Sequence, residues 1–407
     1  MPLYTFSCFR APETICKKLD SIVRDFWWGH DQGVRKMHML HWDKICLNRR
    51  EGGIGYKKFS IINQSMLAKQ FWRISHNPES LLAKTFKAKY FPRCSIHDSS
   101  PKPHHSWFWR NIIKQGNPKL REGRWWVGKG LDIPLNHPDW FQCPTQNLQN
   151  PNLLTGTVAD LIDHNTGVWK ADLVRAVYLF LQCSEILSIP ISKTGGVSDK
   201  LLWKYSSSGE YKVKNAYNLL LKDSTQTSHH YHRPTQFPPE VWNLIWKVNV
   251  PHKVGLFVWK LMHDNLPAYL TLRNRGIPTT SSCPLCKVED ESTPHLFLYC
   301  TFARACWPGS ALAIRTSDLR NSSVQLWISN ILIRYKQMDQ DMMDYLQAIF
   351  TYLWTIWNHK NLVTHESKTP NPMEVILTAQ NLSCSFKEAF NISRNLSRQS
   401  VTHHTAN

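Results

Sequence analysis

Apolar residues recur every three or four positions along much of the chain, which is the spacing of one face of an α-helix. The first such segment covers residues 12–29. It begins with Pro12, which suits a first helical turn, and it ends at Gly29. Between residues 241 and 267 the pattern predicts two helices that are separated at Pro251. Further helices are predicted over residues 60–75, 79–90, 106–116, 214–222, 342–361 and 372–395, and two more on either side of residues 165–167.

Short extended segments are expected at three places. Residues 39–42 form a candidate strand. Residues 123–135 (GRWWVGKGLDIPL) predict a hairpin that turns at residues 128–130, and residues 201–213 (LLWKYSSSGEYKV) predict another that turns at residues 206–209. The sequence therefore predicts a mainly α fold with small β-hairpins.

Two polar stretches indicate a multi-domain organisation. Residues 140–152 are rich in Pro, Asn and Gln, and residues 222–239 form a polar, Pro-containing linker. We expect four segments, which are residues 1–140, 151–223, 236–320 and 321–407.

Composition indicates a folded protein in a reducing compartment. The 407 residues are 42% hydrophobic and include 18 Trp, which is enough material for a substantial core. Eleven Cys residues are an odd number without a pairing pattern, and the N-terminus has no secretory signal, so we expect a nuclear or cytoplasmic protein. No apolar run approaches the roughly 18 residues of a membrane span, so no membrane contact is expected.

The net charge of +19 is concentrated in the first third of the chain. Residues 1–130 hold 24 Lys and Arg against 9 Asp and Glu, whereas the remaining residues hold 25 against 21. Such one-sided positive charge favours a polyanionic partner, so RNA or DNA bound without sequence preference is expected; a basic surface without a ligand is the alternative. The candidate phosphate contacts are Lys17, Lys18, Arg24, Lys69, Arg73, Lys84, Lys87, Lys89, Arg124 and Lys129. The last two flank Trp125 and Trp126, which could stack on bases or belong to a buried core.

Residues 283–300 (CPLCKVEDESTPHLFLYC) hold the strongest chemical motif. Cys283, Cys286, His295 and Cys300 follow the spacing Cys-x2-Cys-x8-His-x4-Cys. Thiolate and imidazole are the ligands that Zn²⁺ prefers in a tetrahedral site, and four protein ligands leave no position open for water. The motif therefore predicts a structural zinc ion, with the acidic excursion between its halves expected to be an exposed loop.

The surrounding sequence resembles a known family. The stretch VWNLIWKVNVPHKVGLFVWKLMHDNLPAYLTLRNRGI, followed by CPLC and EDESTPHLFLYC, resembles the zinc-binding domain at the C-terminal end of plant LINE-type (non-LTR) retrotransposon reverse transcriptases. REGGIGYKKFSIINQSMLAKQFWRI and RWWVGKG resemble the region that follows the polymerase palm. In IWNHKN the usual Arg-Asn pair is replaced by Lys360 and Asn361. The resemblance implies a basic connector over residues 1–140 and a zinc-binding domain over residues 236–320.

Catalytic carboxylates are missing from this sequence. It has no Asp-Asp pair of the kind that holds Mg²⁺ in a polymerase palm, and beyond residue 360 its acidic residues are Glu366, Glu374 and Glu388, too few for an RNase H site. We therefore expect a non-catalytic, retrotransposon-derived fragment. The alternatives are the C-terminal part of a reverse transcriptase whose palm is missing from this chain, and a host-adopted protein adaptor. The sequence sets no oligomeric state.

Overall fold

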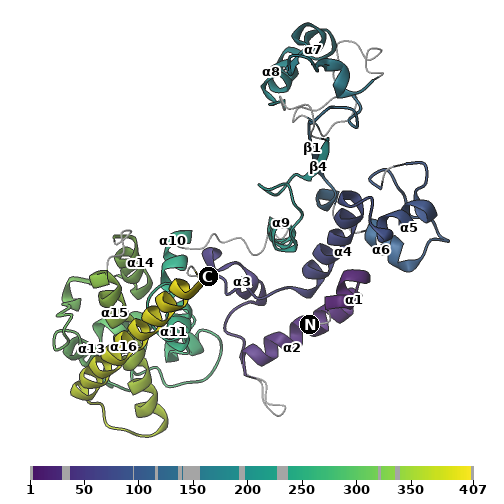
Figure 1. The fold of residues 1–407 in the computed structure, drawn as a ribbon. Helices are drawn as coiled ribbons and strands as arrows, with labels where there is room; N and C mark the ends of the chain where they lie inside the picture. The colour runs from purple at the N-terminus through teal and green to yellow at the C-terminus, as the bar shows by residue number, and fades with distance from the viewer. Residues whose placement is uncertain are drawn as a thin grey trace. The chain divides into compact units, whose positions relative to one another are not determined.

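The computed structural model describes residues 3–29, 37–94, 96–114, 118–135, 140, 156–191, 198–226, 237–319, 322–334 and 340–404. The chain divides into a first unit, Met1–Trp27 with Lys57–His232, and a second unit, Trp28–Tyr56 with Arg233–Asn407. The expected mainly α fold with small β elements is confirmed (Figure 1). The boundaries of the four expected segments lie largely outside the described residues, and that division stays a prediction. None of the described helices is long and apolar enough to cross a lipid bilayer.

The first unit is built on α4 (Phe59–His76). Phe71 and Trp72 of this helix are buried, and the Trp72 indole N–H donates to the Leu120 carbonyl at 2.7 Å. Asn63 attaches the N-terminal segment, because its buried side-chain amide donates to the Phe6 carbonyl at 2.8 Å. The helices that pack on α4 are α1 (Leu3–Cys8), α2 (Glu13–Trp27), α5 (Leu81–Tyr90), α6 (Trp107–Ile113) and α9 (Val213–Gln226), and the unit also contains the short η2 (Pro118–Leu120).

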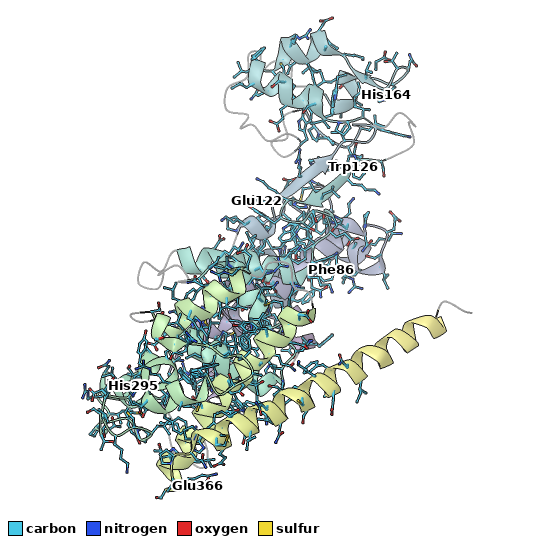
Figure 2. The ribbon with its side chains drawn as sticks, turned by 90° about the vertical axis from the view of Figure 1, so that its left-hand side faces the viewer. Phe86, Glu122, Trp126, His164, His295 and Glu366 are labelled. Carbon is cyan, nitrogen blue, oxygen red and sulfur yellow. The ribbon has the colours of Figure 1, made fainter. Side chains whose placement is uncertain are left out.

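A two-stranded ribbon joins segments of the first unit that are distant in sequence. β1 (Gly123–Trp126) pairs antiparallel with β4 (Lys200–Trp203), and Figure 2 shows Trp126 on this ribbon. The hairpin expected over residues 123–135 is therefore wrong, because β1 pairs with a strand from another segment. The turn expected at residues 206–209 is present, since the Trp203 N–H donates to the Gly209 carbonyl at 2.7 Å, but β4 takes β1 as its strand partner. The Asp199 carboxylate accepts the backbone N–H groups of Gly128 and Gly130, which holds the loop after β1 beside β4. Turn residues alone cannot reveal such a long-range partner.

The chain between β1 and β4 has a core of its own, around Trp140, Tyr178 and Ile186. Residues 165–167 do not separate two helices, as expected, but form the turn of a hairpin, where the Asp163 carboxylate accepts the Asn165 N–H. The elements are η4 (Val158–Leu161), β2 (Ile162–Asp163), β3 (Val168–Trp169), α7 (Ala171–Val177) and α8 (Phe180–Ser188).

The second unit is built on α11 (His252–Met262), α15 (Gln340–His365) and α16 (Pro372–His404), with α15 packed on both other helices. The early segment 37–56 belongs here, because the Gly52 carbonyl accepts the Trp259 indole N–H at 2.8 Å. The strand expected over residues 39–42 is wrong, since a helix begins at Trp42. The remaining elements are α3 (Trp42–Cys46), η1 (Arg49–Glu51), α10 (Pro239–Ile245), α12 (Tyr269–Arg273), η5 (His295–Tyr299), α13 (Thr301–Cys306), η6 (Thr316–Leu319) and α14 (Val324–Arg334).

Candidate metal centre

A tight knuckle presents the first two cysteines of the motif. The Cys283 N–H donates to the Glu289 carbonyl at 2.7 Å, and the Cys283 carbonyl accepts the Lys287 N–H at 2.8 Å. Lys287 has a φ of 60°, the left-handed conformation that closes the turn. These backbone bonds bring the side chains of Cys283 and Cys286 to the same side of the loop.

A single turn of π-helix presents the other two ligands. In η5 the Cys300 N–H donates to the carbonyl of His295, five residues earlier, at 2.7 Å. π-Turns are uncommon and are frequently found at functional sites. The intervening residues Leu296, Phe297 and Leu298 are fully buried. The π-turn therefore directs His295 and Cys300 toward the knuckle while its apolar residues fill the adjoining core.

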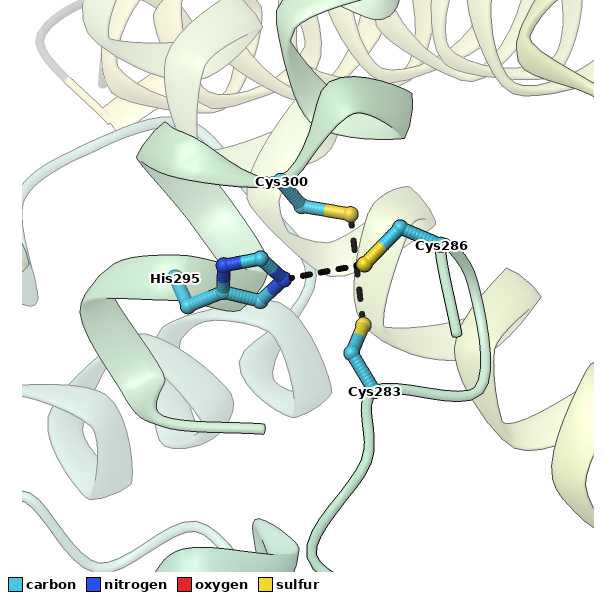
Figure 3. Close-up of side chains that lie close together, drawn as sticks. All are labelled: Cys283, Cys286, His295 and Cys300. Carbon is cyan, nitrogen blue, oxygen red and sulfur yellow. Dashed lines mark hydrogen bonds between the residues drawn. The ribbon is translucent and has the colours of Figure 1, made fainter. Parts of the chain in front are cut away.

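The four ligand atoms converge at one point, as Figure 3 shows, and all lie within 4.8 Å of one another. Cys283 Sγ is 3.9 Å from Cys300 Sγ, and Cys286 Sγ is 3.3 Å from His295 Nε2. Around an ideal tetrahedral zinc ion, two sulfurs are separated by about 3.8 Å and a sulfur and a nitrogen by about 3.5 Å. These two distances agree with that geometry within a few tenths of an ångström, and the other ligand-atom pairs are no more than 4.8 Å apart, so the donor set and its convergence suit a tetrahedral metal.

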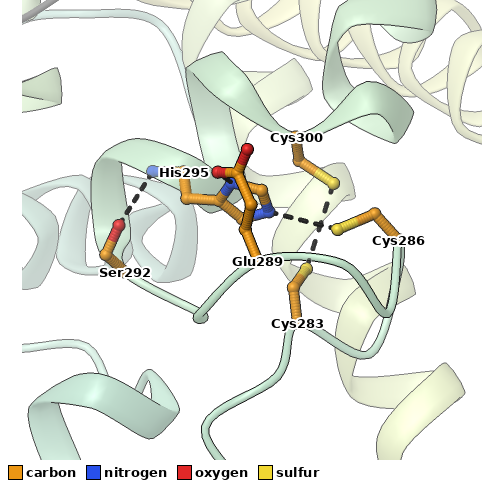
Figure 4. A network of polar contacts seen from close by, with 6 residues as sticks. All are labelled: Cys283, Cys286, Glu289, Ser292, His295 and Cys300. Carbon is orange, nitrogen blue, oxygen red and sulfur yellow. Dashed lines mark hydrogen bonds and ion pairs between the residues drawn. The ribbon is translucent and has the colours of Figure 1, made fainter.

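A carboxylate orients the histidine ligand. Glu289 Oε2 lies 2.9 Å from His295 Nδ1, which leaves Nε2 facing the sulfurs (Figure 4). The backbone N–H of His295 also donates to Ser292 Oγ at 3.2 Å. A carboxylate on the second ring nitrogen of a metal-binding histidine selects the tautomer and makes the ligand more basic. Glu289 comes from the loop between the two halves of the motif, so this loop also serves the site.

The electrostatics of the cluster favour cation binding. A hydrogen bond from the Cys300 thiol lowers the pKa of Cys283 to about 4, although burial opposes this shift. Burial would lower the pKa of His295, but hydrogen bonds to the sulfurs of Cys283 and Cys286 raise it to about 9. The lowered pKa of Cys283 favours the thiolate form that binds a metal, and the sulfurs that raise the pKa of His295 would attract a metal cation in place of its proton.

Comparisons with known proteins agree with this geometry. Residues 211–307 match the family model described as zinc-binding in reverse transcriptase. Over 147 residues the chain is 39% identical to the "Uncharacterized mitochondrial protein AtMg00310" of Arabidopsis thaliana, which covers 36% of this chain and 95% of that protein. The chain belongs to a family of reverse-transcriptase-related retroelement proteins. The predicted zinc cofactor is confirmed, since a zinc-binding family model and a cluster of three cysteines and one histidine coincide.

A longer relative covers more of the chain. It is the Arabidopsis thaliana protein named "Putative ribonuclease H protein At1g65750", 27% identical over 337 residues. That alignment covers 81% of this chain and 53% of the relative, so the chain spans about half the length of that protein.

One acidic residue of the loop does not follow the sequence-based expectation. Glu291 was expected to be exposed but is fully buried, and its Oε1 lies 3.1 Å from Nζ of Lys360, which is also buried. Burial raises the pKa of Glu291 to about 7, while Lys360 opposes the shift. The Lys360 ammonium also lies over the rings of Tyr269 and Trp357, 4.8 and 5.0 Å from their centroids. The only sequence signal was Lys360 in place of the family's usual arginine.

The ten candidate phosphate contacts all lie in the first unit. Nine are exposed, and Arg24 is half-buried beside Asp25. Lys69, Arg73 and Lys87 line one groove of about 1590 Å³, but its described lining holds as many carboxylates as Lys and Arg side chains. The structure therefore brings only some of these cations together, and their contact with nucleic acid stays a prediction.

Proposed function

We propose that the chain is a non-catalytic, nucleic-acid-binding region of LINE-type (non-LTR) retrotransposon origin, which binds RNA or DNA without sequence preference. One observation carries this proposal: the positive charge is concentrated in residues 1–130, and nine of the ten candidate cations there are exposed. Exposed cations neutralise phosphates and release condensed counterions, which gives affinity without base recognition.

The zinc centre has a structural role in this proposal. Cys283, Cys286, His295 and Cys300 would occupy all four positions of a tetrahedral ion, so no substrate or water could bind the metal. The bound ion supplies folding free energy, on the order of 10–16 kcal/mol in small zinc peptides. The chain's own residues then orient the histidine through Glu289 and exclude water through the π-turn.

The test is the salt dependence of binding. Fluorescence anisotropy would measure the affinity of the purified chain for several unrelated RNA and DNA oligonucleotides between about 50 and 200 mM salt. We expect a steep loss of affinity with salt and little variation with sequence. Lys84→Gln/Lys87→Gln/Lys89→Gln should reduce the slope of log K against log[salt] by about 2–3 units on duplex DNA if all three contact phosphate.

A matched control removes the same charge elsewhere. Lys247→Gln/Lys253→Gln/Arg304→Gln changes three exposed cations of the second unit and should leave the slope nearly unchanged. A flat salt dependence of the unaltered chain, or equal losses in the two triple variants, would contradict the proposal.

The length of the longer relative favours a second function, that of the C-terminal part of a reverse transcriptase with its palm elsewhere. About half of that relative lies outside the alignment. An in-frame Tyr-x-Asp-Asp region in the genomic sequence upstream of Met1 would support it. Under the first proposal the purified chain neither extends a primer nor cleaves the RNA of an RNA–DNA hybrid. Either activity, retained through stringent purification, would refute the non-catalytic assignment.

A further inference from the structure

The β1–β4 ribbon has one buried face and one exposed face. In the observed register Trp126 lies opposite Lys200, and Arg124 lies opposite Leu202. Because side chains alternate along a strand, these four residues share one face. Trp126 is 52% exposed, whereas Trp203 on the other face is 1% exposed. The open face therefore carries an exposed indole with a cation directly across from it and another two residues before it on the same strand.

The two cations of this face are available for a ligand. Arg124 and Lys200 are both exposed, and neither has an ion-pair partner among the residues that the structure describes. Lys204 lies nearby but is 3.5 Å from the Glu122 carboxylate, so its charge is already partly neutralised. The ribbon face thus takes its positive charge without an ion-pair partner from Arg124, two residues before Trp126 on the same strand, and from Lys200, opposite Trp126 on the neighbouring strand.

A hollow of about 290 Å³ adjoins the ribbon and is lined by Arg124, Trp126, Trp140 and Trp203 among others. Ser206 and Ser207 also border it, and none of its described lining residues is Asp or Glu. The Trp203 indole N–H is buried and has no hydrogen-bond partner within the described part of the chain. The hollow lies at the small end of the range for ligand sites, which suits one planar ring rather than a large molecule.

Charge and shape together favour a nucleotide over other occupants. A single exposed hydrophobic side chain is common on protein surfaces and by itself indicates nothing. Here Trp126 and Arg124 both border a hollow whose described lining holds no carboxylate. Lys200 lies opposite Trp126 in the ribbon and lines the neighbouring groove, whose lining includes carboxylates. A base offers a π-face to Trp126, and its flanking phosphates offer negative charge to Arg124 and Lys200. A neutral peptide would satisfy the indole but neither cation.

We propose that the β1–β4 ribbon face is a base-stacking site for single-stranded nucleic acid, with Trp126 as the stacking platform and Arg124 and Lys200 as phosphate contacts. This inference rests on the proposed nucleic-acid function and adds a strand preference to it. In a duplex both faces of each base are covered by neighbouring bases, so Trp126 reaches a base only in a single strand or at an end.

The test compares Trp126→Ala with Trp107→Ala. Trp107 is 54% exposed and lies in α6 of the same unit, so it is a matched exposed indole outside the ribbon. Trp126→Ala should weaken the binding of single-stranded RNA and DNA oligonucleotides by about 5- to 100-fold, leave duplex binding unchanged and leave the salt slope unchanged. Trp126→Phe should retain most of the affinity. Trp107→Ala should behave like the unaltered chain.

A second experiment tests the two cations with Arg124→Gln/Lys200→Gln. This variant should reduce the slope of log K against log[salt] for single-stranded oligonucleotides by about 1–1.5 units, while its circular dichroism spectrum stays unchanged. Equal effects of Trp126→Ala on single strands and duplexes, or no effect on either, would overturn the stacking site. If the unaltered chain binds with a steep salt dependence in that case, the proposed function stands and only this inference fails. If it binds no nucleic acid, both fail.

Discussion

Replacing Lys360 by methionine removes the countercharge of a carboxylate in the interior of the second unit. Glu291 is 0% exposed and Lys360 is 2% exposed, and the pair links the zinc loop to α15. Removing one partner of a buried ion pair typically costs about 3–5 kcal/mol, because the other charge stays in a medium of low dielectric. The two aromatic contacts of the ammonium are lost as well. We therefore expect Lys360→Met to lower the free energy of unfolding by about 3–5 kcal/mol at pH 8.

Protonation of Glu291 limits this cost at lower pH. The folded-state pKa of Glu291, about 7, is already above its ordinary value of 4.5, and loss of Lys360 raises it further. A carboxyl group with a raised folded-state pKa contributes stability that is full below pH 4.5 and is lost as the pH rises through the folded-state pKa. The destabilisation by Lys360→Met should therefore be smaller at pH 6 than at pH 8.

Urea unfolding at pH 6, 7 and 8 would measure this effect, followed by circular dichroism and by zinc release to a chromophoric chelator. The matched control is Glu291→Met/Lys360→Met, in which two apolar side chains replace the pair; it should recover most of the stability lost in the single variant. A Lys360→Met protein within about 1 kcal/mol of the unaltered protein at pH 8, or a double variant no more stable than the single one, would refute the reasoning.

Three further outcomes test the zinc centre and its surroundings. Cys286→Ser should lose its zinc, as measured by elemental analysis, and residues 240–310 should unfold while α4 stays helical. The control Cys306→Ser changes a buried thiol outside the cluster and should keep stoichiometric metal. Retained zinc in Cys286→Ser would mean that the ligand set is different. Glu289→Gln should weaken zinc binding about 10- to 100-fold in a chelator competition assay. Asp290→Asn should change zinc affinity little. Equal losses in the two variants would exclude orientation of the histidine by Glu289. Burial lowers the pKa of His263 to about 4, so the stability that this residue contributes is present above pH 6.5 and is lost as the pH falls toward 4. The unaltered protein should be more stable than His263→Phe by about 1 kcal/mol near neutral pH, because His263 forms a hydrogen bond to a backbone carbonyl. This difference in unfolding free energy should shrink between pH 6.5 and 4, and a constant difference would contradict the pKa shift.

The sequence by itself determined most of the helices and the candidate zinc cluster. Helices such as α2, α4 and α15 follow from apolar spacing, because a helix buries one face and its hydrogen bonds are all local. The sequence alone could indicate Cys283, Cys286, His295 and Cys300, because all four lie within 18 residues and thiolate and imidazole at that spacing are the ligands that zinc prefers. The one-sided charge was equally a property of composition.

Only the tertiary structure decided which distant segments meet. The pairing of β1 with β4, the packing of Gly52 against Trp259, and the burial of Glu291 with Lys360 all join residues far apart in the chain. Local patterns predicted two hairpins instead, and they predicted exposure for the whole acidic loop, of which residues 287–290 are exposed and Glu291 is buried. A turn motif or a charged run indicates the local conformation and solvent exposure that a segment favours. Its long-range partner depends on which apolar surfaces are buried together and on the pairing of buried charges when the whole unit folds.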